Sequence, residues 1–155
     1  MDKNTIILTE TNFNKLKNEV KKAKSENKII IYSSDNEDLN RKVLEKLDVN
    51  IVLINQSKRK DFQKQRNSGF NQVMAKIAKK KKVTIGINFD EIIETNSSRE
   101  KSEIIARIKQ NIFLCKKNNL KMKFIIQKEK NERNKHLLNS FGLILGMPTS
   151  MTKAL

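Results

Sequence analysis

Few residues of this sequence are suited to covalent or zinc-dependent catalysis. The chain contains one cysteine, Cys115, and one histidine, His136. A catalytic thiol usually needs a histidine as its base, and the zinc sites of hydrolases commonly take several histidines. Cys115 continues the apolar stripe of an expected helix, which indicates a packing role, whereas His136 lies among Lys and Asn residues. We therefore expect neither thiol nor zinc chemistry from this chain.

Clustered carboxylates offer another route to catalysis, through bound Mg²⁺. Asp35, Glu37 and Asp38 open one expected helix, and Asp90 and Glu91 open another. Acidic side chains in these places complement the positive end of the helix dipole, which gives both groups a structural explanation. The sequence also lacks the glycine-rich loops, GxxxxGK(S/T) or GxGxxG, that bind nucleotide phosphates. We predict that the chain has no catalytic residue, no metal ligand and no cofactor of its own.

The net charge indicates the class of partner. The 155 residues include 33 Lys and Arg against 17 Asp and Glu, which leaves a formal charge of +16. Such an excess suits a chain that binds a polyanion, and nucleic acid is the first candidate. An anionic membrane is the second, but no apolar run approaches the roughly 20 residues of a spanning helix. No basic amphipathic stretch with a Trp- and Phe-rich face is present either, so we expect no membrane partner.

Two features bear on the compartment. The segment from Met1 to Glu10 lacks the charged, apolar and small-residue order of a signal peptide. A single cysteine cannot form an internal disulfide, which is typical of a reducing environment. We predict a cytoplasmic protein.

The basic residues gather in four stretches of the sequence. These stretches are Lys58 to Arg66, Lys76 to Lys82, Lys116 to Lys123 and Lys128 to Lys135. In a parallel α/β sheet, segments that follow strands lie along one edge, where ligands usually bind. The first and last stretches follow expected strands, so we predict that they form one basic rim. Lys79 to Lys82 precede a strand and should lie at the opposite edge, where they also suit the negative end of a helix.

Aromatic residues are too few for base stacking to dominate. The chain has seven Phe, one Tyr and no Trp, and most Phe fall on apolar faces. Proteins that bind single strands or display an RNA-recognition sheet usually carry more exposed aromatic rings. We predict phosphate contact and shape recognition of a folded RNA, with binding that weakens steeply as salt is added.

Short apolar runs alternate with amphipathic stretches along the chain. The runs are mostly β-branched and bounded by polar residues, which predicts buried strands at Thr5–Leu8, Lys28–Tyr32, Val49–Ile54, Val83–Phe89 and Met122–Ile126. Strand–helix alternation predicts parallel strands joined by right-handed crossovers in one α/β domain, residues 1–155. A complete eight-stranded barrel needs roughly 200 residues or more, so an open sheet or an incomplete barrel is expected.

Helix boundaries are readable at several places. Ser34 with Glu37, and Ser97 with Glu100, have the spacing of capping boxes. Asn118–Asn119 suits the end of a helix, because Asn tolerates the left-handed conformation. A less regular helix is expected from about Glu132 to Leu145.

Three blocks of sequence resemble a known family. Arg66-Asn67-Ser68-Gly69-Phe70-Asn71 leads into a helix and a strand ending Gly-Ile-Asn-Phe, and this order resembles archaeal ribonuclease P protein component 3. The family includes the eukaryotic thirty-kilodalton subunit of ribonuclease P. The blocks Ile105–Lys117 and, more weakly, Ser140–Met147 agree. The resemblance is strongest over residues 61–155.

The resemblance implies a TIM-barrel-like fold and a function. It implies a subunit of the endoribonuclease that removes the 5′ leader of precursor tRNA, with ribonuclease P RNA as the catalyst and user of Mg²⁺. It further implies ribonuclease P protein component 2 as a partner and only indirect contact with precursor tRNA. Metal-dependent barrel phosphoesterases look distantly related, but their His-x-His signature is absent here. Two departures stand out: Asn67 replaces the usual Asp, and the part before Asp61 is shorter than in typical members.

Arg66 is the first candidate for RNA contact, because its segment follows a strand and a guanidinium binds phosphate through two hydrogen bonds. Asn71 either meets RNA or caps the following helix. Ser68 and Gly69 are expected to shape the loop, with Gly69 permitting a backbone turn. Further candidates, each also explained as a solvated surface residue, are Lys76, Arg99, Arg107, Lys130 and Arg133.

Two alternatives remain open from the sequence. A stand-alone RNA-binding module, such as a ribosome-associated α/β protein, fits the charge and fold class equally well. A metal-dependent phosphoesterase on a degenerate barrel is the other, and it requires carboxylates that converge at one edge of the sheet.

Overall fold

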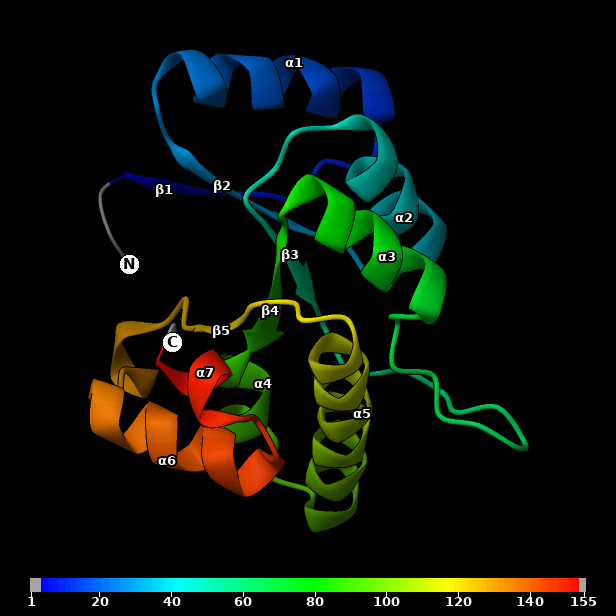
Figure 1. Ribbon diagram of the computed structural model, residues 1–155, viewed down its shortest axis with the longest axis vertical. Helices are drawn as coiled ribbons and strands as arrows, with labels where there is room; N and C mark the ends of the chain where they lie inside the picture. Colours follow the sequence, from blue (N-terminus) through cyan, green and yellow to red (C-terminus); the bar gives the residue numbers. More distant parts are fainter. Residues whose placement is uncertain (1–3, 154–155) are drawn as a thin grey trace.

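The computed structural model describes residues 4–153, which form a five-stranded parallel sheet with helices between the strands (Figure 1). The strands are β1 (Thr5–Leu8), β2 (Ile29–Ser33), β3 (Ile51–Ile54), β4 (Thr84–Asn88) and β5 (Met122–Ile125). Their order in the sheet follows their order in the sequence, and every neighbouring pair is parallel. All five strands predicted from the apolar runs are confirmed, with ends that differ from the prediction by no more than two residues.

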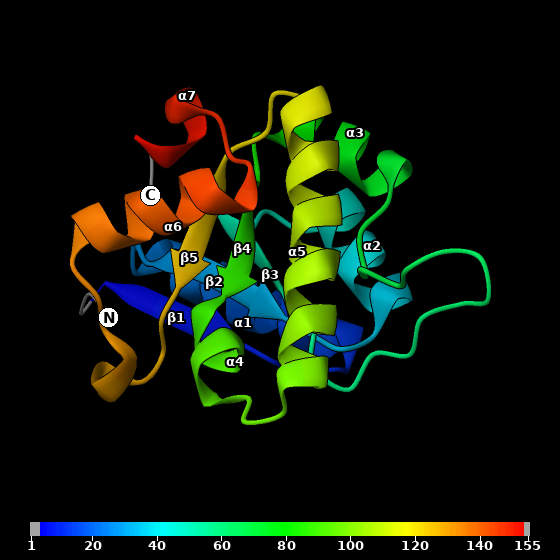
Figure 2. The same ribbon diagram turned by 90° about the horizontal axis from the view of Figure 1, so that it is seen from below.

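The helices lie around the outside of the strands. They are α1 (Phe13–Ser25), α2 (Glu37–Lys46), α3 (Gln72–Lys81), α4 (Phe89–Glu94), α5 (Ser98–Lys117), α6 (Lys135–Leu145) and α7 (Thr149–Thr152), with a 3₁₀ turn η1 (Glu129–Asn131). Figures 1 and 2 show them in an arc from α1 to α6 around the sheet. Consecutive strand order with right-handed crossovers places successive helices on one face, which is the winding of a (β/α) barrel. With five strands, the sheet is an open, incomplete barrel.

The two faces of the sheet differ in how they are packed. The outer face, with Ile30, Val52 and Ile85, joins the apolar faces of the helices in the main hydrophobic core. The inner face carries a separate small cluster of Ile31, Ile51, Leu53 and Ile125. Gly86 lies in the middle of this inner face, where a Cβ atom would be 3.1 Å from side-chain atoms of Ile51 and Leu53. A glycine there lets the neighbouring side chains fill the concave surface.

Capping residues explain where the helices begin, with one correction. The side chain of Ser97 accepts a hydrogen bond from the N–H of Glu100, as its capping-box spacing predicts. The predicted capping box at Ser34 is wrong, because Asn36 caps α2 by accepting from the N–H of Leu39. Ser34 instead accepts from the N–H of Asn36, so it shapes the turn that precedes the cap.

The C-terminal part packs through aromatic rings. Phe89, Phe124 and Phe141 meet edge-to-face or tilted, with ring centroids 5.5 to 5.9 Å apart. This cluster joins α4, β5 and α6, and the predicted last helix is confirmed from Lys135. Among residues 4–153, no helix has both the length and the apolar character needed to cross a bilayer.

Helix α5 provides a direct test of the packing. Ile108 is 2% exposed against the sheet, whereas Phe113 on the same helix is 66% exposed. We expect Ile108→Ala to lower the free energy of unfolding by about 2–5 kcal/mol, because it removes buried methylene groups and leaves a cavity. Phe113→Ala should change it by no more than about 0.5 kcal/mol. Urea denaturation would measure both, and equal losses would contradict this placement of α5.

Candidate nucleic-acid interface

The segment of residues 55–71 follows β3 and leads into α3, and Figure 1 shows its tip extending away from the body of the protein. It contains the first basic stretch and the Arg66–Asn71 block. It lies at the edge where the carboxyl ends of the strands meet, which is the usual ligand-binding edge of barrel proteins. We call residues 55–71 the β3–α3 loop.

Arg107 of α5 holds the beginning of this loop. Its Nε donates to Asp61 Oδ1 at 2.8 Å, and its Nη1 donates to the carbonyl of Gln56 at 3.1 Å. The side chain is 3% exposed, and Glu103 lies 3.6 Å from its Nη2. A buried guanidinium needs such partners, since an unpaired charge in the interior is strongly destabilising.

Arg59 packs inside the loop itself. Its Nε donates to the carbonyl of Asn55 at 2.6 Å, and its Nη1 donates to Glu37 at 2.9 Å. The Arg59 side chain is 8% exposed, and its guanidinium lies against the backbone of Gly69. A Cβ atom at position 69 would be 2.4 Å from the Cζ atom of Arg59, and φ of Gly69 is +68°. Both the left-handed backbone and the close approach therefore require glycine.

Buried amides fix the end of the loop. The side chains of Gln56 and Asn111 both donate to the carbonyl of Ser68, at 2.9 and 3.1 Å. The hydroxyl of Ser68 donates to the carbonyl of Phe70 at 3.2 Å. At the beginning of the loop, the carboxylate of Glu91 accepts from the N–H groups of Gln56 and Ser57. Both ends are thus anchored on the barrel while the tip is presented to solvent.

Arg66 lies exposed near this tip and forms no hydrogen bond or ion pair with another residue of 4–153. The hydrogen bond from Arg107 holds the pKa of Asp61 below its usual value, and the nearby charge of Arg66 adds a smaller effect in the same direction. Asn67 donates its N–H to Asp61 at 2.9 Å, and its side-chain oxygen faces Nη1 of Arg59 at 3.4 Å. Asn67 therefore contacts Arg59 and not Arg66, whose guanidinium is left accessible to a ligand.

The structure places Arg107, one of the predicted RNA contacts, in the interior of the protein. Its guanidinium is buried and is already paired inside the protein, so it positions the β3–α3 loop. Sequence reasoning counted Arg59 only as one of several basic residues and missed its internal role. A signal for Arg107 was present, because it falls on the buried stripe of α5 between Ile104 and Ile108.

The other predicted residues are spread over several elements. Asn71 caps α3, because its side chain accepts from the N–H of Met74 at 3.0 Å. Lys76 is exposed on α3, and Arg99 is exposed on the first turn of α5, where it pairs with Glu103. Lys130 and Arg133 follow β5, in or beside η1.

Acidic residues neutralise part of the expected basic rim. Glu94 of α4 pairs with both Lys128 and Lys130, the latter at 2.9 Å. Arg133 donates to the backbone carbonyls of Lys130 and Glu132 and is otherwise exposed. In the same way, Asp61 pairs with Arg107, and Glu37 of α2 pairs with Arg59 of the β3–α3 loop. Arg66, at the tip of this loop, is an exposed cation of this edge that forms no ion pair with another residue of 4–153.

The chain shares its fold with a chain of archaeal ribonuclease P. That chain belongs to the cryo-EM structure of archaeal ribonuclease P with mature tRNA, and it aligns with a TM-score of 0.80 and 24% sequence identity. The alignment covers 96% of this chain and 62% of the other, so this chain spans about three fifths of its neighbour's length. No protein-family model matches the sequence, and the comparison with curated proteins gave no match either. At this identity, the similarity shows the incomplete TIM-barrel-like fold.

Within the described residues, no group of three or more His, Cys, Asp and Glu side chains is placed to hold a metal ion. At the strand ends, the polar side chains are mostly neutral. Asn88 donates to Asn55 at 3.0 Å, and Asn55 donates to Ser33 at 3.2 Å and to Asp35 at 3.1 Å. The buried thiol of Cys115 has its pKa raised to about 12, which leaves it protonated near neutral pH.

The packing of Arg59 on Gly69 gives a test with a matched control. Gly69→Ala adds a methyl group against the guanidinium at a left-handed position, whereas Gly146→Ala adds one in open space at φ +101°. Both variants carry backbone strain of about 1 kcal/mol. We expect Gly69→Ala to lose at least about 1 kcal/mol more in urea denaturation, because the loop must also move. Equal losses would show that Arg59 does not pack as described.

Glu94 gives a prediction for acid stability. The hydrogen bonds from Lys128 and Lys130 lower its pKa from 4.5 to about 2. Because the folded-state pKa lies below the unfolded one, the contribution is complete above about pH 4.5 and is lost as pH falls through about 2. We expect Glu94→Gln to flatten the decline of stability in this window. Glu19→Gln, on the exposed side of α1, is the control, and two identical profiles would contradict the assignment.

Proposed function

We propose that this chain is a protein subunit of ribonuclease P that binds and stabilises the catalytic RNA. The observation that carries the proposal is the similarity of almost the whole fold, 96% of the chain, to a chain of an archaeal ribonuclease P complex. A net charge of +16 independently favours a polyanionic partner. The Arg66–Asn71 block also resembles archaeal ribonuclease P protein component 3.

The sequence resemblance specifies which subunit and which partners we propose. We assign the chain to the component 3 family, with ribonuclease P RNA and ribonuclease P protein component 2 as its partners in the cytoplasm. In this proposal, the RNA cleaves the 5′ leader of precursor tRNA with its own Mg²⁺, and the protein touches precursor tRNA only indirectly. The neutral hydrogen-bonded Ser33, Asn55 and Asn88, at the edge where barrel enzymes usually carry catalytic groups, support a non-catalytic role.

The β3–α3 loop is the proposed RNA-binding element at the carboxyl edge. Buried Arg59 and Arg107 hold its backbone before any ligand arrives, which lowers the entropic cost of binding. Arg66 then presents a free guanidinium that can form two hydrogen bonds to one phosphate. Exposed Lys60 and Lys64 add sequence-independent attraction to the RNA backbone.

Reconstitution with archaeal ribonuclease P RNA and component 2 tests this function. We expect the wild-type chain to increase leader removal at low Mg²⁺, and Arg66→Ala to reduce that increase several-fold without lowering the melting temperature. Arg66→Lys should recover only part of it, because an ammonium cannot provide the two-pronged phosphate contact. Lys17→Ala, on α1, is the charge-matched control.

Unchanged cleavage with Arg66→Ala would remove Arg66 from the interface. Failure of the wild-type chain to alter cleavage under any condition would contradict the proposed function itself. We also expect no cleavage by the purified chain without RNA. Nuclease activity of the protein alone would favour the phosphoesterase alternative.

A further inference from the structure

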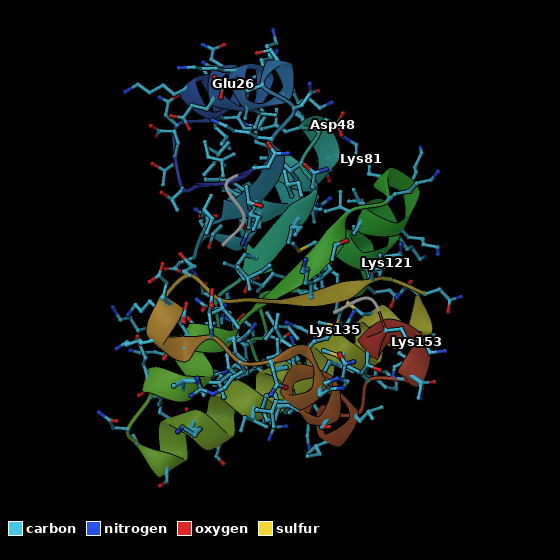
Figure 3. All side chains as sticks on the ribbon, turned by 90° about the vertical axis from the view of Figure 1, so that its left-hand side faces the viewer. Glu26, Asp48, Lys81, Lys121, Lys135 and Lys153 are labelled. Carbon is cyan, nitrogen blue, oxygen red and sulfur yellow. The ribbon has the colours of Figure 1, made fainter. Side chains whose placement is uncertain are left out.

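The opposite edge of the sheet, where the strands begin, carries a second basic surface. Two adjoining hollows of about 400 and 370 Å³ share Lys82, Thr84 and Lys121. Lysines predominate among the charged residues that line them, and these are Lys79, Lys81, Lys82, Lys121 and Lys123. We call these two hollows the amino-edge groove. Figure 3 shows Lys81 and Lys121 along one side of the molecule, with Asp48 nearby.

Within residues 4–153, no carboxylate pairs with the lysines that line this groove. Of the described residues that line it, Asp48 alone is acidic, and Asp48 pairs with Lys24 of α1. Lys79 donates instead to the backbone carbonyl of Asn119 at 2.9 Å, and Lys81 donates to that of Leu47 at 3.2 Å. A neutral carbonyl orients an ammonium group without cancelling its charge. The groove therefore differs from the opposite edge, where carboxylates pair with several of the cations.

The backbone of Lys82 provides an independent observation. In four helix ends of the described chain, a residue with positive φ is followed by an N–H group that bonds a carbonyl five residues earlier. These four residues are Asn27, Lys82, Asn119 and Gly146. Asn and Gly tolerate this conformation, whereas the Cβ of a lysine is strained by it. A strained residue that lines a groove indicates a functional reason for its side chain.

We propose that the amino-edge groove is a second binding surface for the phosphate backbone of folded RNA. This inference rests on the proposed function and extends it from one edge of the barrel to both. Lysine ammonium groups act as point charges on phosphates, so the groove should bind without reading base sequence. The strands between the edges have four or five residues, or roughly 15 Å, so the protein would contact two separate stretches of RNA backbone.

Paired charge-removal variants test the groove. Lys82→Asn with Lys121→Gln removes two exposed lysines from the groove, and Lys15→Gln with Lys17→Gln removes two exposed lysines from α1. Fluorescence anisotropy with labelled archaeal ribonuclease P RNA would give the dissociation constant at several salt concentrations. We expect the groove variant to lower the slope of log K against log salt by about 1.8, or 0.9 for each lost contact. The α1 variant should lower it by less than about 0.5.

Equal slopes for the two double variants would overturn the proposal, because net charge alone would then explain binding. A groove variant that no longer binds vesicles containing phosphatidylserine, but binds RNA as the wild type does, would also overturn the proposal. The groove would then be a membrane-binding surface. If the wild-type chain binds ribosomal RNA as tightly as ribonuclease P RNA, the proposed function fails. In that case, the same two double variants are compared in their binding to ribosomal RNA, and equal salt slopes would overturn the groove.

The single change Lys82→Asn separates charge from structure. Asparagine fits the left-handed conformation better, so we expect the melting temperature to rise by about 1–3 °C. Binding to ribonuclease P RNA should nevertheless weaken severalfold. A lower melting temperature together with unchanged binding would mean that Lys82 serves folding. The left-handed backbone of Lys82 would then no longer support the proposal.

Discussion

Two buried guanidinium groups determine how the candidate interface is presented. Arg107 joins α5 to the beginning of the β3–α3 loop through Asp61 and the carbonyl of Gln56, and Arg59 packs on Gly69 within the loop. A loop of this length would otherwise sample many conformations, and the cost of ordering it would oppose RNA binding. With both arginines in place, the loop is held before it meets a ligand, and the exposed guanidinium of Arg66 stays unpaired. The positive charge of the chain thus has two uses, one inside the fold and one at the surface.

The carboxyl edge and the amino edge of the sheet differ in how their charged side chains are paired. At the carboxyl edge, Glu37, Asp61 and Glu94 neutralise arginines and lysines, and free charge is concentrated near Arg66. At the amino edge, backbone carbonyls, and not carboxylates, accept hydrogen bonds from Lys79 and Lys81. Under the proposed function, the RNA cleaves the precursor tRNA, so the protein needs no catalytic cluster. It does need contacts that hold a folded polyanion in one arrangement. Charged groups on both edges of a rigid barrel suit that requirement.

The sequence was sufficient to predict the order of strands and helices and the class of the fold. β-Branched runs such as Ile29–Tyr32 identified the strands because parallel strands are buried on both faces. The start of α2 was predicted at Ser34 but lies at Asn36. Both residue types can cap a helix, and only the backbone conformation decides which of them does. The place of Arg107 on the buried stripe of α5 could have been noticed from helical spacing. The contact of Arg59 with Gly69 depends on tertiary packing that no local pattern specifies. The same is true of the amino-edge groove, whose lysines come from the end of α3 and from the beginning of β5.

The proposed partner of this chain is ribonuclease P RNA. Sequencing the RNA that co-purifies with the full-length tagged chain from its native cells would identify that partner. We expect ribonuclease P RNA to be the most enriched species relative to total cellular RNA, and its enrichment to fall with Arg66→Ala. Enrichment of ribosomal RNA, with ribonuclease P RNA at background level, would overturn the proposed function.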